Sequence, residues 1–218
     1  YLLIEGGKGG LGNSNFKTST NQAPRKSTTG EKGGALKIRL ELRSFADIGL
    51  VGLPNAGKST FLDAVSSAKP KIGDYPFTTI KPNLGTIKYF DKSFVFADIP
   101  GLIEGASQGT GLGIKFLKHI SRTKALLIFL DPHNSEYDFE NQLKILINEM
   151  RHFDSKLLQK DIWIVLNKID TVDNLDENLS IIDKYIPREL KINQIRGISS
   201  ISKQGVKELF DEVFKKLT

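Results

Sequence analysis

Short apolar runs alternate with longer amphipathic stretches from Ala46 to the end of the chain. Apolar runs of four to eight residues favour buried strands, and apolar positions three or four residues apart favour helices. The pattern predicts strands at Ile48–Val51, Gly85–Tyr89, Phe94–Ala97, Ala125–Asp131, Ile162–Leu166 and Gln194–Ile198. It predicts helices at Ser59–Ser67, Ile114–Arg122, Glu136–Phe153, Leu175–Tyr185 and Gly205–Leu217. This alternation indicates an α/β fold with a mostly parallel sheet flanked by helices, whose ligands bind at the carboxyl ends of the strands.

Residues 1–44 follow a different pattern. Eight of the 20 glycines of the chain lie there among few large apolar residues, which favours loops or extended polyproline-like segments over a packed core. The apolar and charged residues of Leu36–Leu42 alternate as in a half-buried strand. We therefore expect two domains, one over residues 1–44 and one over residues 45–218.

The net charge of +6 is concentrated in the first of these segments. Residues 1–44 hold eight Lys and Arg against three Glu (8 − 3 = +5), and residues 45–218 hold 23 against 22 (+1). Clustered basic residues supply sequence-independent affinity for RNA phosphates. Charges that only solvate loops are the alternative explanation, and the charge pattern alone does not choose between the two.

Composition narrows the possible function classes. The absence of cysteine excludes disulfides, thiolate metal sites and cysteine nucleophiles. The longest apolar run, Ala125–Leu130, is far shorter than the ~20 residues that a membrane-spanning helix needs, and no signal-peptide pattern opens the chain. We expect a cytoplasmic protein without a membrane span. The only methionine is Met150, so we also expect the chain to be a fragment that lacks an N-terminal part.

A phosphate-binding loop follows the first predicted strand of the second segment. Residues 52–59 fit G-x-x-x-x-G-K-[ST] between a strand and a helix, which is the context that such a loop requires. Backbone N–H groups wrap the phosphates, Lys58 reaches the outer phosphates and the Ser59 hydroxyl binds Mg2+. The expected nucleotide contacts are Gly52, Leu53, Pro54, Asn55, Ala56, Gly57, Lys58, Ser59 and Thr60.

A second motif selects guanine over adenine. Asn167, Lys168, Ile169 and Asp170 follow the strand Ile162–Leu166. The Asp170 carboxylate can accept hydrogen bonds from the ring N–H and the amine of guanine, a pair of donors that adenine lacks. The stem of Lys168 can lie along the base.

Loops after two other strands complete the candidate site. Ser199 and Ser200 follow the last predicted strand, where backbone N–H groups could meet guanine O6. Asp98 ends another strand, where it can hold Mg2+ through water, and Gly101 lets the backbone approach a γ-phosphate. Thr78 or Thr79 could add a Mg2+ ligand that senses the γ-phosphate, and the sequence alone does not separate the two.

These motifs, in this order, resemble the bacterial Obg family of ribosome-assembly GTPases. The likeness rests on the runs Asp47–Thr60, Tyr75–Thr79 and Asp98–Ser107, and on Gly6–Asn13 with Asn21–Arg25, which resemble the end of the glycine-rich Obg domain. It implies that Thr79 is the switch threonine and Mg2+ ligand, and it adds Phe77, Thr78, Ile80, Lys81, Ile99, Pro100, Ile169 and Ile201 to the expected nucleotide contacts. The fifth motif is usually Ser-Ala, and Ser200 replaces the alanine. The additional C-terminal domain of the family is not present in these 218 residues.

The catalytic residues expected from these motifs are Asn55, Lys58, Thr79, Asp98 and Gly101. Leu102 occupies the position at which Ras-type GTPases orient the attacking water with glutamine, so we expect slow hydrolysis. In related potassium-stimulated GTPases an asparagine at the position of Asn55 helps to coordinate K+, and the resemblance implies the same role here. The glycine-rich segment Gly101–Gly113 is a candidate second switch region.

The resemblance implies a monomeric molecular switch that binds GTP or GDP and hydrolyses GTP to GDP and phosphate during assembly of the large ribosomal subunit. rRNA of that subunit is the expected partner. The alternative is a binding module that senses GDP or guanosine tetraphosphate (ppGpp) and hydrolyses GTP only incidentally.

Overall fold

The computed structural model describes residues 2–38, 46–67, 71–72, 83–98 and 123–218. The chain divides into two compact units, unit 1 over Tyr1–Leu42 and unit 2 over Arg43–Thr218. Each unit has its own architecture, and the two are described separately.

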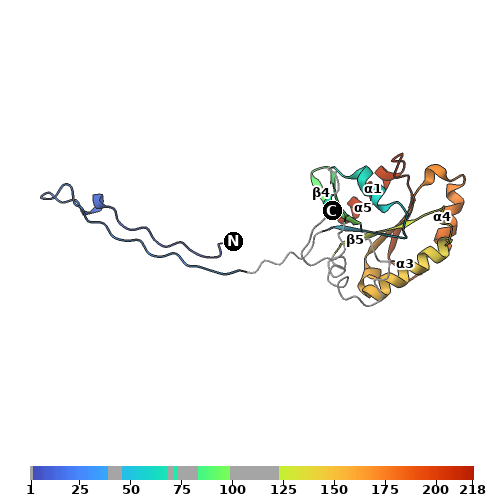
Figure 1. Cartoon of the computed structure of the whole chain (residues 1–218), viewed down its shortest axis with the longest axis horizontal. Helices are drawn as coiled ribbons and strands as arrows, with labels where there is room; N and C mark the ends of the chain where they lie inside the picture. The colour runs from blue at the N-terminus through green and yellow to red at the C-terminus, as the bar shows by residue number, and fades with distance from the viewer. Residues whose placement is uncertain (1, 39–45, 68–70, 73–82, 99–122) are drawn as a thin grey trace. The chain divides into compact units, whose positions relative to one another are not determined.

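Unit 2 is built from strands and helices that follow one another along the chain (Figure 1). The strands are β1 (Ile48–Gly52), β2 (Lys71–Ile72), β3 (Asn83–Tyr89), β4 (Lys92–Asp98), β5 (Ala125–Leu130), β6 (Asp161–Leu166) and β7 (Ile192–Gly197). The α-helices are α1 (Lys58–Val65), α3 (Phe139–Phe153), α4 (Leu175–Lys184) and α5 (Val206–Leu217), and the 3-10 helices are η2 (Ser155–Gln159) and η3 (Ile169–Thr171).

The strands form one sheet in the order β2-β3-β4-β1-β5-β6-β7. The five strands from β4 to β7 in this order are parallel to their neighbours, and the β2–β3 and β3–β4 pairs are antiparallel. Every residue of β1 and β5 is buried, because helices cover both faces of the sheet there. By contrast β3 alternates between buried and exposed residues, as expected where one face meets solvent.

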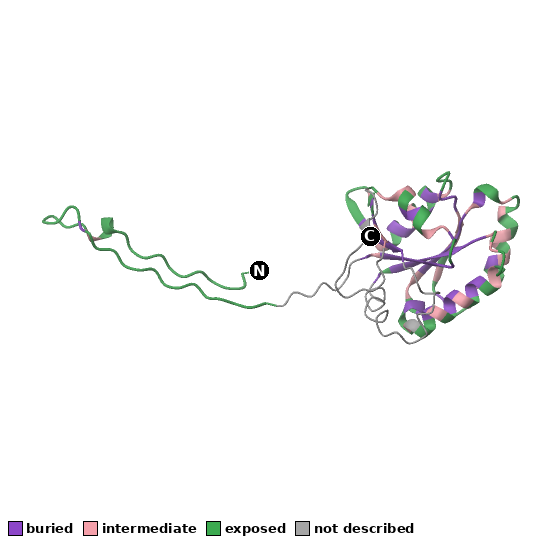
Figure 2. Cartoon of the chain, in the orientation of Figure 1, coloured by how far each residue is buried: buried purple, intermediate pink, exposed green. Residues whose placement is uncertain are grey.

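Helices cover the two faces of the sheet in separate layers (Figures 1 and 2). On one face α3 and α4 pack against Val51 of β1, Ile128 of β5 and Ile164 of β6. On the other face α1 and α5 pack against Leu50 and Phe129. This second layer is rich in aromatic rings, and the ring centroids of Phe61 and Phe129 lie 5.2 Å apart. The mostly parallel α/β sheet expected from the apolar pattern is therefore confirmed.

The described part of unit 1 consists of two extended segments that run side by side and are joined through the 3-10 helix η1 (Asn13–Phe16) (Figure 1). Backbone hydrogen bonds join them, from Thr28 N to Leu11 O (3.0 Å) and from Glu31 N to Lys8 O (2.8 Å). The backbones approach so closely that a Cβ on Gly10 would lie 1.9 Å from Thr28 O. Glycine is therefore required there by contact between the two backbones.

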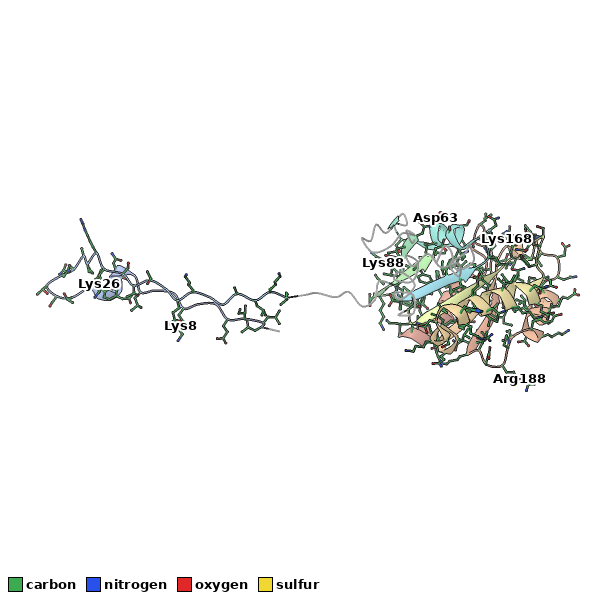
Figure 3. The ribbon with its side chains drawn as sticks, turned by 60° about the horizontal axis from the view of Figure 1, so that its bottom comes forward. Lys8, Lys26, Asp63, Lys88, Lys168 and Arg188 are labelled. Carbon is green, nitrogen blue, oxygen red and sulfur yellow. The ribbon has the colours of Figure 1, made fainter. Side chains whose placement is uncertain are left out.

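Unit 1 has almost no apolar interior within residues 2–38. Pro24 is the one buried residue of that range, and Phe16 is half-buried beneath the Lys26 ammonium, which lies 5.4 Å from the ring centroid. Side chains such as Lys8 and Lys26 project from the backbone instead of covering a core (Figure 3). Backbone pairing and glycine contacts therefore hold these segments together.

Some element ends differ from the expectations, and one strand was not expected. The predicted helix Glu136–Phe153 begins later, at Phe139, because Asn134 Oδ1 accepts hydrogen bonds from the backbone N–H groups of residues 136 and 137 and holds a turn. Asp138 then caps the helix through a 2.8 Å bond from Asn141 N. The two-residue strand β2 is too short for any apolar pattern to indicate.

The predicted strand Leu36–Leu42 is not supported where it can be compared with the structure. Residues 36–38 lie in no strand and are exposed, because no neighbouring strand pairs with them among the described residues of unit 1. Residues 39–42, and the predicted helix Ile114–Arg122, lie outside the described residues. No helix in the described ranges is both long enough and apolar enough to cross a membrane.

Candidate functional site

The predicted site residues of unit 2 gather at the carboxyl edge of its parallel sheet. The registers pair Leu50 with Asp98, Leu130 with Leu166 and Leu166 with Gly197, so these strands end side by side. Loops that begin up to 145 residues apart (198 − 53) therefore meet at one place. In open α/β sheets this edge is where ligands bind.

The loop between β1 and α1, which carries the predicted phosphate-binding motif, contains two residues with a left-handed backbone. Gly57 adopts a left-handed conformation (φ +87°), and a Cβ there would lie 2.2 Å from Asn167 Nδ2. Asn55 is also left-handed (φ +63°) and exposed, a conformation that asparagine tolerates better than most residues. Leu53 and Ala56 are buried beneath the loop, while Pro54 is exposed. Helix α1 begins at Lys58, so its N-terminus faces the loop.

Lys58 turns back over this loop. Its ammonium donates to Gly52 O (2.8 Å) and to Leu53 O (3.1 Å). A charged group held at the mouth of a loop of backbone N–H groups is placed to bind the outer phosphates of a nucleotide.

Ser59 and Asp98 come together from opposite sides of the site. The Ser59 hydroxyl donates to Asp98 Oδ2 at 2.5 Å, and Asp98 is 3% exposed. The second carboxylate oxygen, Oδ1, is buried and has no hydrogen-bond partner among the described residues. A hydroxyl and a carboxylate with an unsatisfied oxygen are the hard oxygen donors that Mg2+ prefers, so this pair fits that ion. No group of three or more His, Asp or Glu in the described residues forms a metal site by itself.

Asn167 joins the phosphate loop to the last loop of the site. Its side-chain N–H donates to Ala56 O (2.9 Å), and its Oδ1 accepts from the backbone N–H of Ser200 (3.1 Å). The side chain is 1% exposed, so both bonds are sheltered from water. The phosphate loop, the loop that carries Asn167 and the loop after β7 are therefore held in one arrangement by a single amide group.

The Ser200 hydroxyl has a definite contact in the structure. Alanine is usual at this position in the family that the sequence resembles. Ser200 Oγ lies 2.8 Å from Asn167 Oδ1 and donates to it, as a second bond beside that of its own backbone N–H. Ser199 Oγ instead accepts from Ser202 N (3.0 Å), which closes the loop. Ile201, between these serines, is 79% exposed.

The remaining guanine-motif residues lie around Asn167. Ile169 is buried, and its backbone N–H donates to Ile198 O (3.2 Å), which ties this loop to the end of β7. Asp170 is exposed at the rim, where its carboxylate is accessible to a base. Thr60 is exposed in the first turn of α1.

Lys168 pairs with a residue that had not been identified as part of the site. Its ammonium lies 2.6 Å from Asp131 Oδ2, directly after β5. The sequence did contain a signal for this, because Asp131 ends the predicted apolar strand Ala125–Asp131 just as Asp98 ends another strand. The lysine that meets it is 37 residues further along, and no local pattern links the two.

Several expected contacts and catalytic residues lie outside the described residues. They are Phe77, Thr78, Thr79, Ile80, Lys81, Ile99, Pro100 and Gly101. The same holds for Leu102 and the rest of the segment Gly101–Gly113. Their roles stay predictions.

Comparison with known proteins agrees with this geometry. A family model described as "50S ribosome-binding GTPase" matches residues 47–168, and a second one, described as "GTP1/OBG", matches residues 1–44.

Solved structures of other GTP-binding proteins share the fold. One is the G domain of the T. maritima FeoB iron transporter, with a TM-score of 0.59 and 19% identity over 78% of this chain and 98% of that one. Another is a GTP-binding protein from the archaeon Sulfolobus solfataricus in complex with GDP, with a TM-score of 0.64 and 21% identity over 78% of this chain. The match spans only 53% of the archaeal chain. At this level of identity the likeness shows the fold alone.

The first family model covers more than half of the chain and spans the phosphate loop, Asp98 and Asn167. The second covers the glycine-rich segment that precedes them. The chain therefore belongs to the family of 50S ribosome-binding GTPases, and with its GTP1/OBG segment it is a GTP-binding GTPase of the Obg type.

Proposed function

We propose that this GTPase is a switch in the assembly of the large ribosomal subunit, which binds rRNA in one nucleotide state and is released after slow hydrolysis of GTP to GDP and phosphate. The observation that carries the proposal is the joining of the phosphate loop and the last loop through Asn167 in a chain that also has a GTP1/OBG segment. We further propose that it acts as a monomer in the cytoplasm.

The described residues support a division of labour at the nucleotide. Lys58 and the backbone N–H groups of residues 52, 53 and 55–60 would bind the phosphates, and Asp170 would select guanine. Ser59 and, through water, Asp98 would hold Mg2+, together with Thr79. Mg2+ supplies positive charge that neutralises the β- and γ-phosphate oxygens during phosphoryl transfer. Gly101 would approach the γ-phosphate.

A potassium ion is the second cofactor that we propose, with Asn55 as a ligand. The exposed, left-handed position of Asn55 in the phosphate loop supports this role, because its side-chain oxygen is not committed to the core. Such an ion would supply the charge that other GTPases obtain from an arginine finger.

Exposed basic residues support unit 1 as the part that meets rRNA. The described residues 2–38 hold six Lys and Arg against two Glu, all of them exposed: Lys8, Lys17, Arg25, Lys26, Lys32, Lys37, Glu5 and Glu31. Phosphate contacts of this kind weaken as salt rises, so the affinity for the large subunit should fall with ionic strength.

Turnover with and without purified large subunits tests the proposal. We expect GTP hydrolysis in Mg2+ and K+ to be slow for the chain alone and faster when the subunit is added. Unchanged turnover with the subunit, combined with tight binding of GDP or ppGpp, would instead support the sensing module. Preference for ATP in a competition assay would contradict the guanine site itself.

A further inference from the structure

The ammonium group of Lys168 is held by a buried carboxylate. Lys168 Nζ lies 2.6 Å from Asp131 Oδ2, and the Asp131 side chain is only 5% exposed, compared with 34% for Lys168. Salt and water screen a pair with one partner buried to this degree much less than they screen a surface pair. The position of the Asp131 carboxylate therefore limits where the Lys168 side chain can go.

Asp131 is itself fixed on three sides. Gln142 of α3, which is 1% exposed, donates to Asp131 O (2.9 Å) and accepts from Asp131 N (3.0 Å). The backbone N–H of His133 donates to Asp131 Oδ1 (3.0 Å). One carboxylate oxygen is thus bound within the loop after β5, and the other is left to face Lys168.

The backbone of Lys168 is held by the same loop. Lys168 has φ +63°, a left-handed conformation that is unfavourable for a long side chain. Thr171 Oγ1 donates its one proton to Lys168 O (2.6 Å), so it must accept from His133 Nε2, which lies 2.6 Å away. Contacts therefore run from Asp131 through His133 and Thr171 to Lys168 and back to Asp131.

We propose that Asp131 is a positioning residue for guanine-nucleotide binding, which acts by holding Lys168. With its ammonium fixed at Asp131, the apolar stem of Lys168 can lie along the face of the base. A lysine that is ordered before the ligand arrives loses less side-chain entropy on binding, and this raises the affinity. The proposal rests on the proposed function, because it requires Asn167–Asp170 to bind guanine.

The dissociation rate of ribose-labelled fluorescent GDP in Mg2+, measured on the full chain, tests this role. We expect Asp131→Asn to speed dissociation about tenfold, as for loss of one charged hydrogen-bond partner. Lys168→Met should have an effect of similar size. If Asp131 acts through Lys168, Asp131→Asn should add less than about twofold in the Lys168→Met background. The KM for GTP should rise in Asp131→Asn with little change in kcat, a split that loss of folded protein would not produce.

A matched control is available at the opposite edge of the sheet. Asp161 begins β6 and forms a similar pair with Lys191 at 2.8 Å. Asp161→Asn removes the same kind of carboxylate far from the nucleotide loops, so we expect the parental dissociation rate. If Asp131→Asn does not fold, Thr171→Val provides a milder test. The Thr171 side chain is exposed, and its loss should speed dissociation about two- to threefold.

Two results would overturn the proposal. One is a folded Asp131→Asn variant with the parental dissociation rate, or a parental rate for Thr171→Val where Asp131→Asn does not fold. The other is a double variant in which the two single effects multiply.

Asp170→Asn distinguishes this failure from that of the proposed function. If Asp170→Asn fails to shift the preference from GDP to xanthosine diphosphate, both proposals fail. If the preference shifts but Asp131→Asn does not change the dissociation rate, the guanine site stands and only the role of Asp131 is removed.

Discussion

Asn167 is the residue through which the phosphate loop and the last loop of unit 2 meet. Its amide bonds to Ala56 O on one side and to Ser200 on the other, and Gly57 leaves the space that it occupies. A motif in the sequence predicts that Asn167 contacts the nucleotide, but the motif does not reveal these partners. They lie 111 residues before it and 33 after it, and only the sheet order brings them together.

The Ser200 hydroxyl should contribute measurably to this arrangement. Ser200→Ala removes one of the two bonds that Asn167 Oδ1 accepts and keeps the bond from the backbone N–H. We expect GDP to dissociate roughly fivefold faster, which corresponds to about 1 kcal/mol for one buried hydrogen bond. The measurement is a chase of fluorescent GDP by unlabelled GDP.

Ser202→Ala is the matched control for that experiment. The Ser202 side chain makes no hydrogen bond among the described residues, and its backbone N–H, which bonds Ser199 Oγ, is kept. Equal dissociation rates for the two variants would show that the Ser200 hydroxyl has no part in holding Asn167.

Asn55 should determine how strongly potassium stimulates hydrolysis. If its side-chain oxygen coordinates K+, turnover of the parent chain should be faster in K+ than in Na+ at equal ionic strength. Asn55→Thr should reduce that ratio towards one, since the amide oxygen is lost. Steady-state phosphate release in the two salts measures the ratio. Equal rates for the parent chain would contradict the role of K+.

Among the elements, helix α3 carries a carboxylate whose protonation is coupled to stability. Burial raises the pKa of Glu149 from 4.5 to about 7, and its Oε2 atom has no hydrogen-bond partner among the described residues. The folded state therefore binds this proton more tightly than the unfolded state does. The stabilisation from Glu149 is complete below pH 4.5 and is lost as the pH rises through about 7.

Glu149→Gln should remove this dependence. The melting temperatures of variant and parent should agree near pH 4.5, and the variant should melt at a higher temperature once the pH exceeds about 7. Thermal unfolding followed by circular dichroism across this pH range measures the difference. Glu136→Gln replaces an exposed carboxylate just before the same helix and should show no such trend. A constant difference at all pH values would refute the coupling.

The strands of the parallel sheet could be predicted from sequence because burial on both faces makes them continuous apolar runs, as in β5 (Ala125–Leu130). The order of the strands in the sheet could not be predicted, because strand pairing is decided by contacts between residues that are far apart in the sequence. Local polar contacts decided the helix ends, as the turn at Asn134 shows for α3. For residues 36–38, the described part of the predicted strand Leu36–Leu42, the alternating pattern was misleading, because alternation indicates a strand only where a partner strand is present.

On the scale of the whole molecule, the two units are held together internally by different forces. Unit 2 has a double-sided apolar core around β1, β5 and β6. Within residues 2–38, unit 1 has one buried residue, Pro24, and relies on backbone hydrogen bonds and close glycine contacts. Substitutions should therefore affect unit 1 through backbone spacing more than through loss of apolar burial.

Gly10→Ala tests this view of unit 1. The new Cβ would lie 1.9 Å from Thr28 O, so the two extended segments must separate there. We expect faster amide exchange at Leu11 and Thr28 and weaker binding to large ribosomal subunits, with unchanged GDP dissociation. Gly9→Ala is the control, because a Cβ at Gly9 meets no atom within 4 Å. Equal exchange rates in both variants would show that close backbone contact does not hold the segments together.

The two bonds of Asn167 also bear on when the nucleotide site can form during protein synthesis. Translation produces Ala56 early, but Ser200 and the Phe214 ring that packs with the aromatic layer around Phe61 are made near the end of these 218 residues. A nascent chain that stops before Ser200 has a phosphate loop and a guanine motif but lacks the last partner of Asn167. GTP capture by a growing chain should thus begin only after β7 has joined the sheet and α5 has packed against it, which makes nucleotide binding a late indicator of the folding of unit 2.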